Sequence, residues 1–318
     1  MNLSDPTLRR WAIRLFKIAL LALVAWGIHS TLSNGWRQLQ NEHWNLSQLR
    51  PAWMVNAAVL YLLGQLGPGW FWWKTLGWLG QPARLPETLR AYYIGHIGKY
   101  APGKALVIVI RAGLLRSGGT TATAATVAVF FETLTTMGVG AAMAVVILAA
   151  RFTEHRGLIG AAALLWLVVS GPTLPAIFRR LVRFTGAGKL DPAMADRLTH
   201  LRYGSLVWSW LPIGAAWVLM GLSLSATARA AGFHSSLTLI DEIAFCTAAV
   251  AMAVVGGFLS FVPGGLGVRE AVLLELLTVC YGADGALIVS IVSRLAWIVA
   301  ELVISGLLYL GVRGRASA

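Results

Sequence analysis

The residues best suited to chemistry lie together at positions 260–270, where the sequence is SFVPGGLGVRE. This stretch lies in the most apolar part of the chain, yet it holds Pro263, Gly264, Gly265, Gly267, Arg269 and Glu270. Proline breaks a helix because it lacks a backbone N–H group, and glycine permits backbone angles that other residues avoid. Charged side chains are costly at membrane depth unless protein or water surrounds them. The stretch therefore predicts a broken helix that is buried in protein or lines a cavity.

Such a break offers the groups that bind a phosphate. A helix that begins after the glycines presents free N–H groups and a partial positive charge. The planar guanidinium of Arg269 matches the oxygen atoms of a phosphate, and Lys104 and Arg111 supply similar groups earlier in the chain. Together they predict a site for a phosphate headgroup whose acyl chains stay in the lipid. Glu270 has the alternative of pairing with a nearby arginine.

A weaker copy of the pattern lies at positions 100–104 (YAPGK), with Arg111 following. In both copies Pro-Gly precedes an arginine, and a long apolar helix with one charge inside it comes next. That charge is Glu132 in the first copy and Arg294 in the second. Two interrupted segments at corresponding places in two halves of a chain are typical of the binding sites of transporters.

Glu132 and Arg294 are predicted to lie close together, because a buried pair would relieve two costly charges at once. Taken alone, Glu132 is either the partner of a buried arginine or part of a path for substrate or protons. Arg294, Trp297 and Glu301 have the spacing of one helix face, so all three are candidates for the same site.

Composition sets the class of protein. The chain has 318 residues, of which 57% are hydrophobic and 12% charged, whereas a soluble domain has about 25% charged residues. We therefore expect an all-α polytopic membrane protein, with residues 1–318 forming a single transmembrane domain. The net charge of +13 indicates orientation and contact with anionic membrane headgroups rather than nucleic acid binding. Cys246 and Cys280 both lie in apolar runs, and no disulfide is expected.

Six full spans are predicted, at about 15–33, 51–73, 120–150, 157–178, 205–228 and 285–311. Basic residues collect before the first span, at 74–116, after the fourth span and after the last, which places both termini in the cytoplasm. Short apolar pieces on either side of Pro102-Gly103 predict a re-entrant hairpin, with a pair of surface helices as the alternative. A second broken element is expected at 243–282.

These spans predict an inverted repeat. Span two runs inward and span five runs outward, and each is followed by a Pro-Gly hairpin and then by a long charged span. Residues 51–150 therefore correspond to 205–312, with a connector span and a basic cytoplasmic loop at 157–204. The two hairpins would enter from opposite faces and meet near the middle of the membrane.

The expected function is translocation of an anionic or modified phospholipid, or of a lipid-linked precursor, by a flippase or scramblase. No P-loop motif for ATP is present, and the six histidines are too scattered to form a metal site, so no cofactor or metal is expected. One alternative is a membrane-embedded transferase for lipid phosphates, although such enzymes use clustered Asp residues. Another is a non-catalytic partner of a separate lipid synthase. A homo-oligomer is left open.

Residues 261–270 (FVPGGLGVRE) resemble the signature of the lysylphosphatidylglycerol synthase transmembrane-region family. The first-half motif of that family is similar to residues 100–104, to residues 111–115 (RAGLL) and to Phe131-Glu132. The resemblance covers about 15–315. It implies a multi-pass protein of the bacterial inner membrane that resembles a lipid flippase, as the membrane domain of the multiple peptide resistance factor does. No soluble aminoacyl-transferase domain is expected, so the resemblance does not imply synthase activity, and the chain is not expected to be an enzyme.

Overall fold

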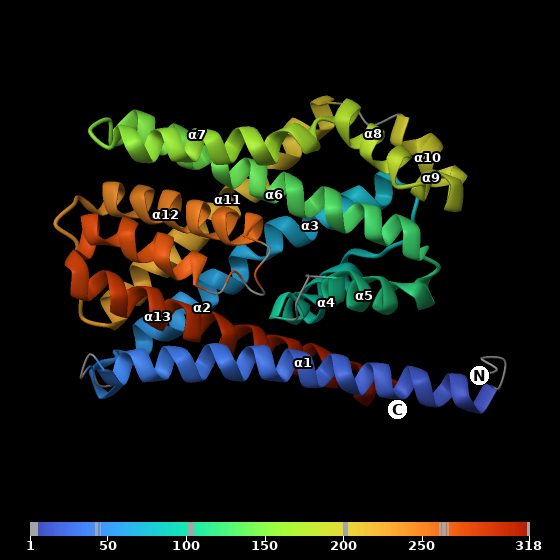
Figure 1. Cartoon of the computed structure of the whole chain (residues 1–318), viewed down its shortest axis with the longest axis horizontal. Helices are drawn as coiled ribbons and strands as arrows, with labels where there is room; N and C mark the ends of the chain where they lie inside the picture. The colour runs from blue at the N-terminus through green and yellow to red at the C-terminus, as the bar shows by residue number, and fades with distance from the viewer. Residues whose placement is uncertain are drawn as a thin grey trace.

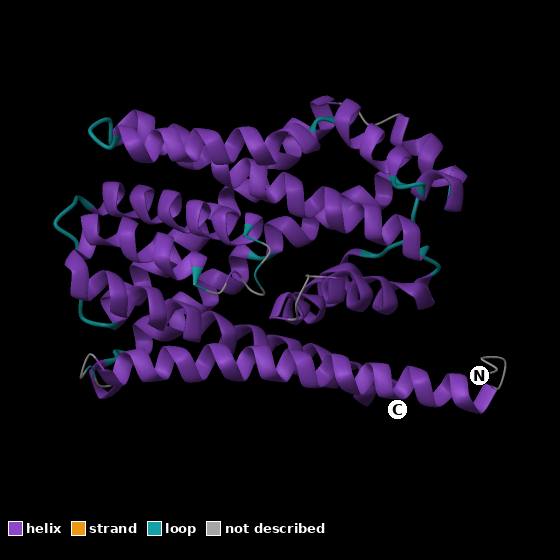
Figure 2. Cartoon of the chain, viewed as in Figure 1, coloured by secondary structure: helices purple, strands orange, loops and turns teal. Residues whose placement is uncertain are grey.

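Helices account for nearly all of the computed structural model, which describes residues 6–41, 44, 46–100, 105–199, 203–260, 262, 265 and 267–316. Figure 2 shows helices and loops, with no strand among the described residues. The longer helices, drawn in Figure 1, are α1 (Pro6–Asn41), α2 (Pro51–Gly64), α3 (Leu66–Trp78), α4 (Leu85–His96), α5 (Ala105–Leu115), α6 (Ala122–Arg151), α7 (Arg156–Ser170), α8 (Pro175–Phe184), α10 (Pro192–Thr199), α11 (Tyr203–Ala230), α12 (Leu239–Leu259) and α13 (Val268–Ala316). Shorter pieces are η1 (Leu46–Gln48), η2 (Ile97–Tyr100), η3 (Arg116–Gly118), η4 (Gly171–Thr173) and α9 (Ala187–Leu190).

Local sequence explains where several of these helices begin and bend. The first turns of α2, α4 and α8 contain a proline, whose missing N–H group has no partner there in any helix. The hydroxyl of Thr121 accepts a hydrogen bond from the Ala124 N–H and caps α6, and Thr238 caps α12 in the same way. Gly282 has a φ of 69° and kinks α13, because glycine adopts this backbone conformation without strain.

Five of the described helices are long and apolar enough to cross a membrane: Ala122–Arg151, Arg156–Thr173, Leu206–Ala230, Leu239–Leu259 and Val268–Gly311. The all-α polytopic class predicted from composition is therefore confirmed. Predicted span one lies in α1, while predicted span two is divided between α2 and α3, which meet at Gln65. The end predicted for span four was wrong: α7 stops at Ser170 and not at 178, because Pro172 and Pro175 follow within five residues.

Two helical hairpins approach each other from opposite ends of the molecule (Figure 1). One is formed by α4 and α5, which have 12 and 11 residues and are thus only about 17 Å long, far short of an apolar layer of about 30 Å. The predicted alternative of two surface helices does not fit, since α4 packs against α3, α5 and α13. The other hairpin is formed by α12 and the first part of α13, up to the kink at Gly282.

The second hairpin is longer than the first. With 21 residues, α12 is long enough by itself to cross an apolar layer. Its C-terminal residues Gly257 and Phe258 nevertheless line a central cavity together with the tip of the first hairpin. The internal symmetry of the two halves stays a prediction. Cys246 and Cys280 are buried as free thiols.

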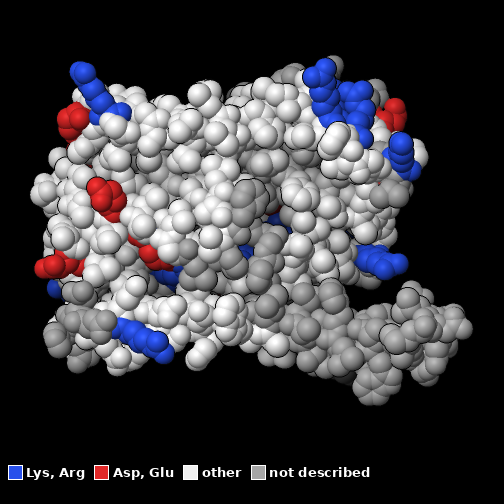
Figure 3. All heavy atoms as spheres, viewed as in Figure 1, with Lys and Arg blue, Asp and Glu red and all other residues white. Residues whose placement is uncertain are grey.

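Basic side chains gather at one end of the molecule. Figure 3 shows Lys and Arg atoms over the end that carries α8. This helix contains Arg179, Arg180 and Arg183, of which the last two are exposed. Figure 1 shows that α1 begins, and α13 ends, toward this same end. Phe178 and Val182 of α8 are buried, so the helix is anchored by its apolar side.

Glycines allow the central helices to come very close. A Cβ atom on Gly221 of α11 would lie 2.7 Å from the backbone nitrogen of Thr247 in α12, and one on Gly140 of α6 would lie 2.8 Å from the Trp217 indole nitrogen. Backbone cannot move aside as a flexible side chain can. Close packing without a side chain at these positions therefore holds α6, α11 and α12 together around the cavity.

Gly221→Ala is expected to lower the thermal unfolding midpoint in detergent, because the added methyl group must push α11 and α12 apart, at a cost of about 1–3 kcal/mol. The matched control is Gly160→Ala on α7, where a Cβ meets nothing within 4 Å; its midpoint should stay the same or rise slightly. Equal midpoints for the two variants would contradict the close approach.

Candidate functional site

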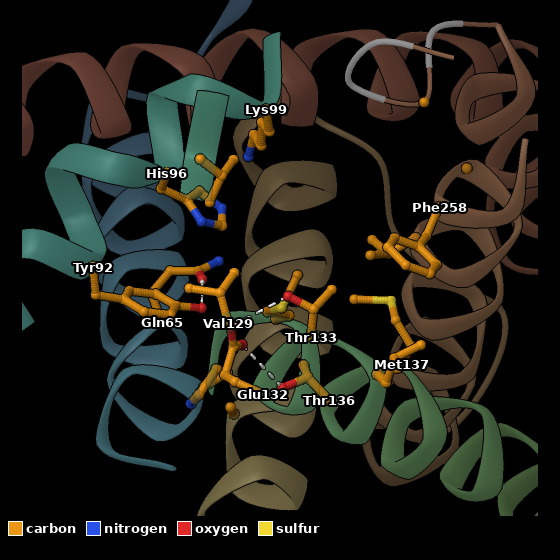
Figure 4. Close-up of a pocket in the computed structure, with 18 of the residues that line it drawn as sticks. Gln65, Tyr92, His96, Lys99, Val129, Glu132, Thr133, Thr136, Met137 and Phe258 are labelled. Carbon is orange, nitrogen blue, oxygen red and sulfur yellow. Dashed lines mark hydrogen bonds between the residues drawn. The ribbon is translucent and has the colours of Figure 1, made fainter. Parts of the chain in front are cut away.

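The two hairpins meet around a cavity of about 230 Å³. Figure 4 shows His96 and Lys99 on one side, Phe258 and Met137 on the other, and Glu132 with Thr136 between them. The polar side chains that line the cavity are Tyr61, Gln65, Tyr92, His96, Lys99, Arg111, Glu132, Thr133, Thr136 and Arg269. Sites for drug-sized ligands have volumes of about 300–1,000 Å³. This cavity therefore suits a small polar group rather than a whole lipid.

Arg111 and Glu132 form a buried ion pair at one side of the cavity. The Arg111 Nη1 atom lies 2.9 Å from the Glu132 Oε2 atom, and both side chains are less than 5% exposed. Arg111 is held over the ring of Tyr92 at 4.0 Å and near that of Trp72 at 5.2 Å. The hydroxyl of Thr136 donates to the Glu132 carboxylate as well. These contacts hold Arg111 in one place, so its main role is to neutralise Glu132.

Arg269 is the cation of the cavity that has no acidic partner among the described residues. Its Nε and Nη2 atoms are buried without a hydrogen-bond partner within the described part of the chain. Its guanidinium lies 4.5 Å from the ring centre of Trp297, which gives it an aromatic support but accepts none of its hydrogen bonds. Buried N–H groups are normally paired, so this guanidinium is suited to an anionic ligand.

Glycines bring Arg269 to the cavity. Gly265 has a φ of +70°, and a Cβ atom there would lie 3.0 Å from the Cα atom of Gly257 in α12. A larger residue at either position would separate the loop from α12. The prediction of a glycine-rich break that positions Arg269 thus agrees with the geometry of the described residues.

Glu301 lies in a second polar cluster, beside the cavity. Its carboxylate accepts hydrogen bonds from the hydroxyl groups of Tyr61 and Tyr100 and forms an ion pair with Lys99. The His96 Nε2 atom lies 3.7 Å away. Glu301 is 2% exposed, so this cluster is a buried charge network in which Lys99 supplies the positive charge.

The predicted pair of Glu132 with Arg294 was wrong. Glu132 pairs with Arg111, and Arg294 pairs with Glu270 on the same helix. Because the first turn of α13 lies against its own second part across the kink at Gly282, Glu270 can reach Arg294 within one chain segment. The alternative that Glu270 pairs with a nearby arginine is confirmed. Its other oxygen accepts a hydrogen bond of 2.7 Å from the Gly267 N–H group.

The predicted site residues fall into three groups. Arg111, Glu132, Gly265 and Arg269 line the cavity. Gly267, Glu270, Arg294, Trp297 and Glu301 are not among the lining residues. Arg294, Trp297 and Glu301 are buried and have the predicted spacing of one face of α13. Lys104, Pro263 and Gly264 lie outside the described residues.

Sequence reasoning missed Tyr61 of α2, Tyr92 and His96 of α4, and Lys99 of η2 as site residues. Tyr100 was noted there only as the first residue of the earlier Pro-Gly motif. Tyr92, His96 and Lys99 are spaced at i, i+4 and i+7, which is the spacing of one helix face and was therefore visible in the sequence. Within the described part of the chain no three His, Cys, Asp or Glu residues lie together as metal ligands would.

An all-helical polytopic membrane protein with a charged central cavity is the class that this fold and site define. The family model described as lysylphosphatidylglycerol synthase TM region matches residues 14–305, so the chain belongs to that family. Membership connects the protein with membrane lipids. A search of curated proteins finds no match.

Arg111→Met is expected to destabilise the protein by about 3–5 kcal/mol, because it leaves Glu132 buried without a cation. The double variant Arg111→Met/Glu132→Leu should recover most of that loss, because it removes both charges together. Unfolding in detergent, followed by circular dichroism with temperature or denaturant, measures both changes.

The matched control is Arg151→Met, which breaks a pair with Asp241 whose side chains are 47% and 29% exposed. Exposed pairs contribute at most about 1 kcal/mol, so this variant should change stability little. A double variant at Arg111 and Glu132 that is as unstable as the single one would show that packing, and not charge, is the cause.

Proposed function

We propose that this protein moves a phospholipid or a lipid-linked precursor with an anionic headgroup between the leaflets of a membrane, in the manner of a flippase or scramblase. The observation that carries the proposal is the guanidinium of Arg269, buried at the cavity with no partner for two of its nitrogen atoms among the described residues. A phosphate oxygen is the ligand that best completes such a group.

The size and position of the cavity fit a headgroup rather than a whole lipid. Phe130 lines the cavity and is 51% exposed on the outer surface of α6, so the cavity borders the surface that faces the acyl chains. Figure 3 shows basic atoms recessed near the middle of this view, whereas the other charged atoms lie nearer the two ends. A headgroup can enter from the side while its tails remain in the bilayer.

The distribution of charged residues supports one orientation of the protein in the membrane. The end with α8 carries Arg179, Arg180 and Arg183, and basic loops face the cytoplasm in membrane proteins. This arrangement supports cytoplasmic N- and C-termini in a bacterial inner membrane. Contact of these arginines with anionic headgroups is part of the same proposal.

Catalysis is not part of the proposal. A transferase for lipid phosphates uses clustered acidic groups to hold a metal ion, whereas Glu132 and Glu301 each lie with a cationic partner. A non-catalytic role beside a separate lipid synthase gives no role to Arg269, which has no acidic partner among the described residues. Translocation is the function that uses both the cavity and its free guanidinium.

Arg269→Ala is expected to lower the rate of lipid movement by about tenfold to a hundredfold, because a charged hydrogen bond contributes about 1.5–3 kcal/mol. The assay uses liposomes with purified protein and phosphatidylglycerol labelled on its acyl chain, with a membrane-impermeant quencher reporting movement between leaflets. Arg269→Lys should retain part of the rate, since it keeps the charge but not the planar fork.

The control is Arg156→Ala, an exposed arginine at the start of α7, which should leave the rate unchanged. Equal rates for wild type and Arg269→Ala would remove Arg269 from the mechanism. If the lipid stays in its leaflet while mass spectrometry finds a new lipid product, the protein is a transferase. Neither movement nor product would point to the partner role.

A further inference from the structure

Lys99 is the cation that both pairs with Glu301 and lines the cavity. The ammonium group of Lys99 pairs with the Glu301 carboxylate, and the same side chain lines the cavity. Figure 4 shows it at the rim of the cavity beside His96. Lys99 is 22% exposed and has a flexible, unbranched chain, so it is able to turn from Glu301 toward a ligand.

The other cavity cation with a carboxylate partner is held more firmly. Arg111 is 3% exposed and lies over the rings of Tyr92 and Trp72. Arg294, which pairs with Glu270, is not among the residues that line the cavity. Among the described pairs, only that of Lys99 and Glu301 combines access to the cavity with a mobile cation.

The groups that face Glu301 come from three neighbouring elements and from its own helix. They are Tyr61 of α2, His96 of α4, Lys99 and Tyr100 of η2, and Arg269 and Arg294 of α13. Arg294 is paired with Glu270, and an anion in the cavity engages Arg269. When Lys99 turns toward the same anion, the groups that still serve Glu301 are the two neutral tyrosine hydroxyls. A carboxylate that loses its paired cation in a dry interior becomes strongly disposed to bind a proton.

The numbers of positive and negative side chains at the cavity can be compared among the described residues. Lys99 and Arg111 are matched by Glu301 and Glu132, and Arg269 is left over. An anion with one negative charge neutralises Arg269 without any further change. An anion with two charges draws Lys99 as well, and neutrality then requires a proton on Glu301.

We propose that Glu301 is a proton-binding site coupled through Lys99 to the occupancy of the cavity, so that a headgroup with two negative charges, such as a phosphomonoester, enters with one proton. The new O–H bond forms on the Glu301 carboxylate, and the proton comes from the aqueous phase. A singly charged phosphodiester headgroup enters without a proton. This inference rests on the proposed function, since it takes the cavity to be the site for an anionic headgroup.

The test uses anions that do not themselves titrate near neutral pH. Protein in detergent is titrated with sulfate, which has two charges, or methyl sulfate, which has one; calorimetry reports binding, and a pH indicator in weak buffer reports proton uptake. We expect about one proton per sulfate bound and almost none per methyl sulfate. Because the proton is taken up, sulfate affinity should fall about tenfold per unit rise in pH, while methyl sulfate affinity stays constant.

Two variants and a control locate the proton. Glu301→Gln should reduce proton uptake with sulfate to near zero. Lys99→Gln should do the same, because Glu301 then holds its proton before the anion arrives. Glu275→Gln, an exposed carboxylate on the same helix, should keep the wild-type uptake. If both site variants misfold, the comparison of the two anions in the wild type still decides.

The outcomes separate this inference from the proposed function. Equal proton uptake with the two anions, or uptake that survives Glu301→Gln, would overturn the inference and leave the translocation assay unaffected. Failure of both anions to bind would overturn the anion site on which both proposals rest. Hexyl sulfate should bind more tightly than methyl sulfate, since a lipid site also contacts the tail; equal affinities would mark a site for free anions and overturn the lipid headgroup.

Discussion

A charge that is removed from water must find a partner, and this constraint governs the interior of the protein. An unpaired ion in a dry interior costs several kcal/mol, so buried acids and bases occur together. Glu132 has Arg111, and Glu301 has Lys99 with two tyrosine hydroxyls. Arg269 differs from these pairs, because its Nε and Nη2 atoms are buried without a hydrogen-bond partner among the described residues and it forms no ion pair there. This difference is the reason for proposing an anionic ligand at Arg269.

The hairpins make this charged interior compatible with a membrane. Neither α4 nor α5 is long enough to cross an apolar layer: α4 ends, and α5 begins, inside the protein beside the cavity. Helix ends expose backbone polar groups that lipid cannot satisfy. Because the two hairpins meet at a polar cavity, these backbone groups are shielded from lipid. The same arrangement brings residues that are far apart in the sequence into one site.

Access and charge together link the structure to lipid movement. The cavity is too small for an entire lipid, and it borders the outer surface at Phe130. A polar headgroup can therefore leave the membrane–water interface for a neutralising interior while its tails never leave the bilayer. In the proposed translocation, Arg269 and Lys99 replace water around the negative charge, which lowers the cost of moving the headgroup through the apolar layer.

The sequence by itself determined the class of protein and singled out Arg111, Glu132 and Arg269, all of which line the cavity, because composition and charges within apolar runs are local properties. It did not determine which charges pair. Glu132 and Arg294 occupy corresponding positions in the two halves of the sequence, and an ion pair between them was predicted. In the structure Glu132 pairs with Arg111 instead. Lys99 looked like one of many basic loop residues until η2 brought it to Glu301. Pairing depends on how helices pack in three dimensions, and only the tertiary structure decides that.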